Sequence, residues 1–149
     1  MTLITRRHSL ALLGAAMATP AISEPIYLNS SGVAIRGFDP VSFFTEEDAI
    51  KGSIDHELKT DHGLWRFETD ANLQRFKAAP EEFMPQFGGY CADGIARGFK
   101  RGSDPTVWVM VRGKLYMHYS IAVQNVWAED IRGNIGLANE NWPKLKDTL

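Results

Sequence analysis

The fold is decided by residues 56–67, which read HELKTDHGLWRF. Two segments that mix apolar and polar side chains flank Asp61-His62-Gly63, a short connection in which glycine accepts the positive φ of a tight turn. Trp65 and Phe67 lie two residues apart and therefore share one face of the second segment. We predict a β-hairpin with one aromatic face.

A second hairpin is predicted at residues 107–119, VWVMVRGKLYMHY. Its strands are rich in Val, Trp and Tyr, which favour extended structure, and the Arg-Gly-Lys sequence in the middle forms the turn. Tyr116 and His118 then share one face of the last strand. Met110 and Met117 are expected to oppose each other across this hairpin, as core residues or, since thioethers bind Cu(I), as metal ligands.

Helical segments are predicted between the hairpins. Thr69 suits the cap of the first helix, because its hydroxyl can accept a hydrogen bond from an amide of the first turn. Pro80 suits the first position of the next helix. We expect that helix to place Phe83 and Phe87 on one face and to end at Gly88-Gly89.

After the second hairpin, Ser120 is expected to cap a helix that Gly133 interrupts, with a further short helix running toward Trp142-Pro143. Residues 24–37 are predicted to form an extended lead-in. The predicted order is a hairpin, helices, a second hairpin and further helices. This order is typical of an α+β fold rather than of repeated βαβ units. We predict one small domain of two antiparallel β-hairpins packed with several short helices.

Residues 1–21 match a twin-arginine secretion signal. Arg6-Arg7 precede an apolar segment, and small residues follow at the positions that a signal peptidase reads, which predicts cleavage near Ala18 or Ala21. The alternative is a cytosolic protein with a short apolar N-terminal helix. On the first interpretation the working domain is residues 22–149, in the periplasm or secreted. Twin-arginine export carries folded proteins, often with a cofactor already bound.

Composition and charge exclude several classes of function. The chain has 149 residues, 44 % of them hydrophobic and 23 % charged, with a formal net charge of −2. These are values of an ordinary globular domain. A mildly acidic domain without a basic stripe is not expected to bind nucleic acid or an anionic membrane surface. No apolar run approaches the ~18–20 residues that span a bilayer, so no membrane-spanning segment is expected.

Three segments occur in an order that resembles the YHS domain. They are 38–41 (FDPV), 61–67 (DHGLWRF) and 76–83 (FKAAPEEF). A secreted subgroup of that family is similar over most of the remaining chain, through the segments 88–92 (GGYCA), 113–116 (GKLY), 133–135 (GNI) and 141–145 (NWPKL). The resemblance implies a small domain associated with heavy-metal handling, as beside copper-transporting ATPases, with cysteine thiolates as the ligands.

The chain departs from the family pattern at the thiolate positions. Ser42 stands where the first cysteine would follow Asp39-Pro40-Val41, and Glu68 and Asn72 stand where the paired cysteines of the helix start would fall. We expect Asp39 to form a turn rather than to bind a metal. The general metal function of the family therefore does not transfer directly to this chain.

Cys91 is the main candidate for chemistry, because as the only cysteine it cannot form an intramolecular disulfide. His118 is a candidate to bind a metal ion beside it or to activate its thiol. Tyr90 and Tyr116 are candidates to line the same binding site, and His62 is a candidate third metal ligand. The alternatives are a small buried cysteine and structural histidines that are hydrogen-bonded or solvated.

Three functions remain open on these residues. The first is an exported YHS-like binding protein that holds a soft transition metal such as copper, or a small ligand, near Cys91 and His118. The second is a metal-free interaction module with a protein partner, which lost the cysteine site. The third is a thiol enzyme with Cys91 as nucleophile and His118 as base. No Cys-x-x-Cys, His-Glu-x-x-His or phosphate-loop motif occurs, so we favour a binding protein over an enzyme.

Overall fold

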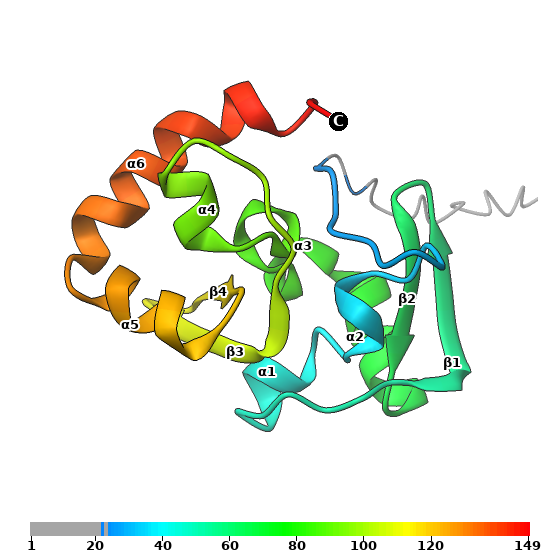
Figure 1. The fold of residues 1–149 in the computed structure, drawn as a ribbon. Coiled ribbons are helices and arrows are strands. Elements are labelled where there is room, and N and C mark those ends of the chain that lie inside the picture. The colour runs from blue at the N-terminus through cyan, green and yellow to red at the C-terminus, as the bar shows by residue number, and fades with distance from the viewer. Residues whose placement is uncertain (1–21, 23) are drawn as a thin grey trace, which may run out of the picture.

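Both predicted hairpins are present in the structure, a computed structural model that describes residue 22 and residues 24–149. The predicted secretion signal, residues 1–21, lies outside the described residues. The elements are η1 (Ile35–Gly37), α1 (Ser42–Thr45), β1 (Ser53–Thr60), β2 (Gly63–Phe67), α2 (Asp70–Ala78), α3 (Pro80–Phe83), η2 (Gln86–Gly89), α4 (Ala92–Ala96), β3 (Asp104–Val111), β4 (Lys114–His118), α5 (Ile121–Ala128) and α6 (Ile131–Leu145). They make a small α+β domain with two separate two-stranded antiparallel sheets, as predicted (Figure 1). None of the described helices has the length and apolar character needed to cross a bilayer.

The first hairpin buries its aromatic face against α2. Strands β1 and β2 are antiparallel, with Thr60 opposite Gly63 at the turn. Trp65 and Phe67 are both fully buried, and their rings lie 4.9 and 5.3 Å from the ring of Phe76 in α2. The prediction that the two aromatic residues of β2 share one face is therefore confirmed.

The helices between the hairpins are partly as predicted. Thr69 caps α2, since its hydroxyl accepts a hydrogen bond from the Asn72 amide at 3.1 Å. Helix α3 begins at the predicted proline but ends at Phe83, so the prediction that Phe83 and Phe87 share a helical face is wrong. Pro85 cannot continue the helical hydrogen-bond pattern, and Phe87 has a positive φ of 55°.

The second hairpin has a two-residue turn rather than the predicted three-residue one. Arg112 and Gly113 have φ values of 51° and 74°, the left-handed conformation that such turns require. This turn sets the register so that Met117 pairs with Trp108, and the prediction that Met110 and Met117 oppose each other is wrong. The two methionines lie diagonally on one face of the hairpin and pack into the core.

The C-terminal helices divide at a different point from the predicted one. Ser120 caps α5 as expected, accepting a hydrogen bond from the Val123 amide at 3.3 Å. Gly133 does not interrupt the last helix, because α6 begins after Asp130 and runs through both Gly133 and Pro143. The Asp130 carboxylate accepts a hydrogen bond from the Gly133 amide at 2.9 Å, and this cap starts the helix.

Residues 24–37 fold back on themselves, so the predicted extended lead-in is wrong. A turn at residues 29–32 brings Leu28 beside Ala34, and the two residues form an antiparallel bridge. Ile35-Arg36-Gly37 then have consecutive positive φ values of 39°, 55° and 80°. An extended lead-in was the simpler expectation because β-branched residues rarely adopt positive φ.

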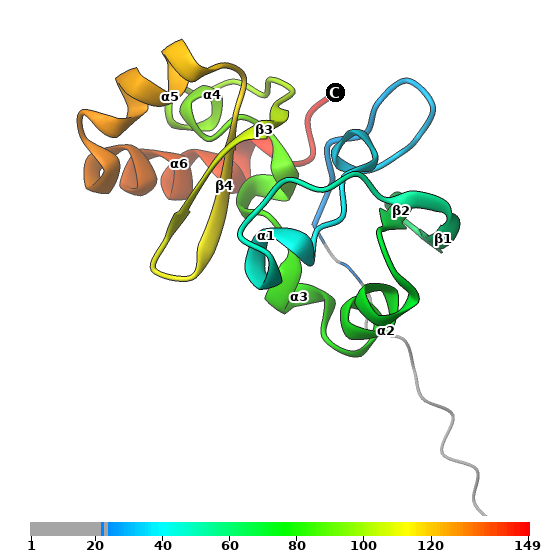
Figure 2. The same cartoon turned by 90° about the horizontal axis from the view of Figure 1, so that it is seen from below.

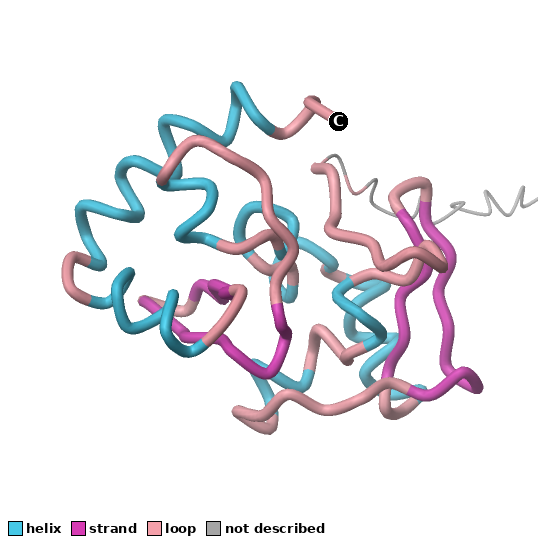
Figure 3. Tube along the Cα trace, viewed as in Figure 1, coloured by secondary structure: helices cyan, strands magenta, loops and turns pink. Residues whose placement is uncertain are grey.

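Strand β4 separates two clusters of buried side chains. The first core cluster consists of Ile26, Ala34, Ile35, Phe38, Val41, Phe43, Trp65, Phe67, Phe76, Leu115 and Met117. The second core cluster consists of Phe87, Ala92, Ile95, Ala96, Tyr116, Trp127 and Ala138. Figure 2 shows α4, α5 and α6 grouped beside β3 and β4, and in Figure 3 the two hairpins lie apart. The molecule thus has two sides. One holds the first hairpin and the first core cluster, and the other holds the second core cluster with α4, α5 and α6 (Figure 2).

Candidate functional site

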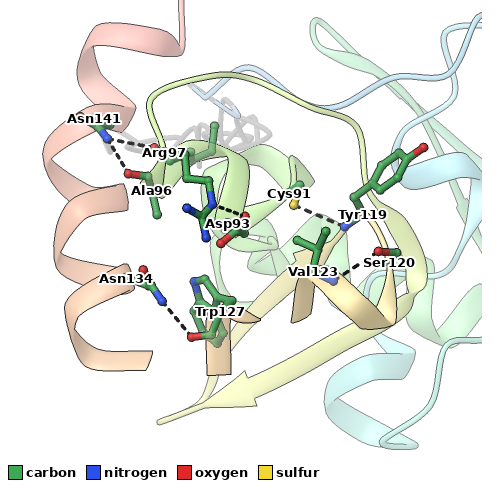
Figure 4. Close-up of polar contacts among 11 residues, drawn as sticks. Cys91, Asp93, Ala96, Arg97, Tyr119, Ser120, Val123, Trp127, Asn134 and Asn141 are labelled. Carbon is green, nitrogen blue, oxygen red and sulfur yellow. Dashed lines mark hydrogen bonds and ion pairs between the residues drawn. The ribbon is translucent and has the colours of Figure 1, made fainter. Parts of the chain in front are cut away.

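Cys91 lies against the second hairpin, directly before α4. Its side chain is 1 % exposed, and its Sγ accepts a hydrogen bond from the Tyr119 amide at 3.3 Å (Figure 4). The backbone of Cys91 forms a parallel bridge with Met117, and its amide donates to the Arg101 carbonyl at 2.8 Å. The thiol is therefore fixed next to the two residues that flank His118 in the chain.

His118 is fully buried and faces the second core cluster. Its ring centroid lies 4.8 Å from that of Trp127, and Tyr116 contacts the same indole at 5.6 Å. The prediction that Tyr116 and His118 share a face of the strand is therefore confirmed. Because side chains alternate along a strand, the imidazole projects to the opposite face from Met117.

Burial controls the protonation state of His118. Loss of solvation lowers the pKa of its imidazole to about 4, while the nearby negative charge of Asp93 acts in the opposite direction. At neutral pH the ring is therefore uncharged and offers one N–H donor and one acceptor nitrogen. The neutral imidazole is also the form that coordinates a metal ion.

Four buried polar atoms at this place have no hydrogen-bond partner among the described residues. They are Nδ1 and Nε2 of His118, Oδ1 of Asp93 and Nε1 of Trp127. The other carboxylate oxygen of Asp93 accepts a hydrogen bond from Nε of Arg97 at 2.8 Å. In Figure 4 the Asp93 carboxylate and the Trp127 indole point toward each other. We call Asp93, His118 and Trp127 the His118 cluster, which has donors and acceptors available for a small polar group.

The two candidate tyrosines occupy different surroundings. Tyr116 is 3 % exposed, and burial raises the pKa of its phenol. Tyr90 is half-buried, and its ring lies 5.6 Å from that of Tyr27 and 6.1 Å from that of Trp142. Burial, and secondly the charge of Tyr27, raise the pKa of Tyr90. Tyr116 thus adjoins the His118 cluster, while the ring contacts of Tyr90 lie with the N-terminal segment and α6.

His62 lies in the turn between β1 and β2. Figures 1 and 2 both place that hairpin across the molecule from β4. Within the part of the chain that the structure describes, no group of three or more His, Cys, Asp or Glu side chains is arranged to hold a metal ion. Cys91, His118 and His62 are therefore not brought together as one three-ligand centre.

A second polar centre occupies the positions where the YHS resemblance places cysteines. Asp39 is fully buried, and its Oδ1 accepts a hydrogen bond from the Val41 amide at 2.8 Å, so the predicted turn at Asp39 is confirmed. Its Oδ2 accepts hydrogen bonds from the Glu68 amide and from Nδ2 of Asn72, both at 2.8 Å. One carboxylate thus ties together the start of α1, the end of β2 and α2.

Ser42 extends this arrangement from α1. Its buried hydroxyl lies 2.9 Å from the carbonyl oxygens of Asp39 and Asp48 and accepts a hydrogen bond from the Ile50 amide at 3.3 Å. We call Asp39, Ser42, Asn72 and the Glu68 amide the Asp39 network. Among the described residues, no buried side-chain atom of this network lacks a partner.

Two residues of the His118 cluster were missed by reasoning from the sequence. Asp93 lies two residues after Cys91, and the spacing of Asp93 and Arg97 on one helix is a signal for an ion pair. In the sequence, Trp127 is indistinguishable from the other apolar residues of the last predicted helical region. Its contact with the His118 imidazole depends on how α5 packs onto β4, which no local pattern indicates.

Comparisons with protein-family models, with curated proteins and with solved structures find no match to this chain.

Proposed function

We propose that this protein is an exported YHS-like domain that acts as a metal-free binding module for a protein partner. The observation that supports the proposal is the Asp39 network. The three positions at which the resemblance places cysteines, Ser42, Glu68 and Asn72, meet around Asp39 through hydrogen bonds. The twin-arginine pattern in residues 1–21 supports export.

The network offers a physical reason why such a fold does not need thiolates. A metal bound by cysteines would cross-link the segments that carry them, and the Asp39 carboxylate cross-links the same segments. The hydroxyl of Ser42 and the amide of Asn72 are poor ligands for soft metals, which prefer thiolate, thioether and imidazole. Since Ser42 already bonds backbone groups and Asn72 already bonds the Asp39 carboxylate, these side chains have little capacity left for a ligand.

Restoring the cysteines tests the proposal. We expect the wild-type protein to show no tight binding of Cu(I) or Zn(II) in competition with a chelator and no metal-dependent rise in melting temperature. The triple variant Ser42→Cys/Glu68→Cys/Asn72→Cys, in a Cys91→Ala background, is expected to bind one equivalent of metal, because hydrogen bonds to Asp39 hold the side chains of residues 42 and 72 and the backbone of Glu68 close together. In a pull-down from periplasmic extract, the metal-free wild type is expected to retain a specific partner.

A matched control carries the same number of cysteines at exposed and separate positions. Asp55→Cys/Lys77→Cys/Glu129→Cys, in the same background, is expected to bind metal only weakly. Circular dichroism of each variant shows whether the fold is retained. Tight binding of one soft metal ion by the wild type would contradict the metal-free proposal. Failure of a folded triple variant to bind metal would remove the support that it takes from the YHS resemblance.

A second candidate function is favoured by the buried imidazole. His118 has both ring nitrogens unpaired among the described residues, and the Cys91 thiol is fixed beside the neighbouring positions of the chain. On this proposal the protein binds a soft transition metal or a small ligand through these two residues. Two protein ligands leave coordination positions to be filled by a partner or a small molecule, so such a metal would be exchangeable.

Variants at the two residues separate this candidate from the first. If it is right, Cu(I) binds to the wild type, and Cys91→Ser and His118→Gln each abolish the binding. Equal metal content in the wild type and both variants contradicts it. The thiol-enzyme hypothesis has its own readout, because a catalytic thiolate is alkylated fast at neutral pH, whereas a buried thiol reacts only when the fold opens.

A further inference from the structure

An open cavity of about 470 Å³ lies on the surface near the end of β4, and no residue of the Asp39 network or the His118 cluster lines it. Its lining residues come from three segments of the chain and are Tyr27, Arg36, Gly102, Ser103, Asp104 and Tyr119. A volume of this size is within the range of small-molecule sites in proteins. An inference about this cavity therefore goes beyond the proposed function and does not depend on whether metal binds elsewhere.

Arg36 is held at this cavity by a strained backbone. Ile35 and Arg36 have φ values of 39° and 55°, although neither is glycine and Ile35 is β-branched and fully buried. Hydrogen bonds hold the segment in place, from the Ile35 amide to the Tyr27 carbonyl at 3.0 Å and from Nζ of Lys51 to the Arg36 carbonyl at 3.0 Å. Strain that the surroundings enforce in this way clusters at ligand-binding sites.

Positive charge exceeds negative charge around Asp104 at this cavity, although the chain as a whole is acidic. Arg36 and Asp104 are only loosely paired, with Nη1 and Oδ2 4.0 Å apart and side chains 49 % and 41 % exposed. Hydrogen bonds from Thr106, together with the charges of Arg36 and Lys51, lower the pKa of Asp104. Arg36 and Lys51 thus place two cations near one anion, whereas the formal net charge of the protein is −2.

Two tyrosine rings give the cavity planar walls. The Arg101 guanidinium carbon lies 3.3 Å from the centroid of the Tyr119 ring, which holds the guanidinium flat and leaves its N–H edges exposed. On the other side, the Tyr27 ring packs directly on the backbone of Gly102. A Cβ at Gly102 would lie 2.6 Å from the ring, so only glycine allows this packing. In Figure 4 the Tyr119 ring extends away from Trp127.

We propose that this cavity binds a small organic anion with a planar body, of the aromatic carboxylate class. The guanidinium of Arg36, which lines the cavity, binds the carboxylate together with that of Arg101, which lies over the ring of the lining residue Tyr119. The planar N–H groups of a guanidinium match the two oxygens of a carboxylate. The rings of Tyr27 and Tyr119 pack against the planar body of the ligand. Asp104 keeps Arg36 oriented through a pair that is loose enough for the anion to enter.

Titration of the protein with benzoate, followed by NMR chemical shifts, tests the proposal. Benzoate is expected to bind with a Kd of about 1 mM, as suits a small ligand in an open cavity. Acetate, which has the charge without the ring, and benzamide, which has the ring without the charge, are expected to bind more weakly. The shifted amides are expected to lie at residues 101–104 and 119, and added salt is expected to weaken the binding.

Charge variants locate the site. Arg36→Gln is expected to weaken benzoate binding about tenfold, because it removes one charge-assisted pair. Arg101→Gln is expected to weaken it to a similar extent, and Gly102→Ala is expected to weaken it by displacing the Tyr27 ring. Arg75→Gln in α2 removes an exposed positive charge elsewhere and is the matched control, with benzoate binding expected to be unchanged.

Three results would overturn the inference. They are no benzoate-induced shifts at these amides, equal binding of acetate and benzoate, or equal losses in Arg75→Gln and Arg36→Gln. None of them bears on the metal titrations of the proposed function.

Discussion

The Asp39 network and the His118 cluster are two buried polar centres built in opposite ways. In the Asp39 network one carboxylate accepts hydrogen bonds from three donors on three segments of the chain. In the His118 cluster four polar atoms of three residues have no partner among the described residues. Within the described part of the chain, the side of the molecule around Asp39 has one such atom, Nε1 of Trp65, which belongs to the aromatic packing and not to the network.

The difference separates a fully hydrogen-bonded centre from one whose polar atoms are unpaired among the described residues. Pairing a buried polar group contributes about 1 kcal/mol to stability, whereas leaving it unpaired costs about 1–3 kcal/mol. The Asp39 network is therefore stabilising as it stands. The unpaired polar atoms of the His118 cluster carry a cost that hydrogen bonds to a polar molecule or ion would relieve.

The largest expected effect is at the paired centre. Asp39→Ala leaves two main-chain amides and the Asn72 side chain without their acceptor in a buried place. We expect the free energy of unfolding to fall by about 4 kcal/mol or more, measured by urea denaturation. Asp55→Ala, at an exposed position in β1, is the matched control and is expected to change it by less than about 0.5 kcal/mol. A small change in the free energy of unfolding on Asp39→Ala would show that the Asp39 network is not the main interaction that stabilises the side of the molecule around Asp39.

The next effect is a pH dependence at the unpaired centre. The pKa of His118 is about 4 in the folded protein and 6.5 without its surroundings. The unfolded chain therefore takes up a proton between these values while the folded protein does not, and stability falls as pH decreases from 6.5 to about 4. The expected loss is about 3 kcal/mol, with no further contribution from His118 below its folded pKa.

Carboxylates also titrate in this range, so the comparison is made between variants. His118→Gln has no imidazole and is expected to lose this part of the pH dependence. His56→Gln, in β1, removes a histidine outside the His118 cluster and is the matched control. A His118→Gln variant with an unchanged pH profile would mean that the imidazole is not desolvated as its burial indicates.

Local sequence signals predicted many of the strands, turns and helix caps around both centres. Alternation identified both hairpins and placed Trp65 and Phe67 on one face, because period two is a property of the strand itself. The caps at Thr69 and Ser120 were also predictable, since a cap involves only residues within one turn. The Asx-type turn at Asp39 belongs to the same class of local signal.

The centres themselves depend on contacts that sequence spacing does not encode. Asn72 reaches Asp39 across 33 residues, and Tyr119 donates to Cys91 across 28 residues. Resemblance to a family pointed at positions 42, 68 and 72, but not at Asp39, whose carbonyl bonds Ser42 and whose carboxylate bonds Asn72 and the Glu68 amide. The burial of His118 against Trp127 depends on the packing of α5 on β4. The positive φ of Ile35 could not be predicted either, because a β-branched residue rarely adopts this conformation.

The smallest expected effect tests whether the two sides of the molecule unfold as one unit. Gly136 is exposed in α6, and a Cβ there would meet no atom within 4 Å, so Gly136→Ala is expected to stabilise the protein by about 0.5–1 kcal/mol through helix propensity. Gly133→Ala is the matched comparison in the same helix. Its Cβ would collide with the capping carboxylate of Asp130, and loss of that cap, worth about 1 kcal/mol, is expected to cancel the gain.

Hydrogen exchange of two amides, measured in Gly136→Ala, shows whether the Asp39 network and the His118 cluster unfold together. The Glu68 amide bonds to Asp39, and the Tyr119 amide bonds to the Cys91 sulfur, so each reports on one side of the molecule. If the domain unfolds as one unit, a substitution in α6 raises the protection of both amides equally. If only the Tyr119 amide gains protection, the side that holds His118 opens independently of the Asp39 network. Local opening would then give a ligand access to the unpaired polar atoms while the paired centre stays folded.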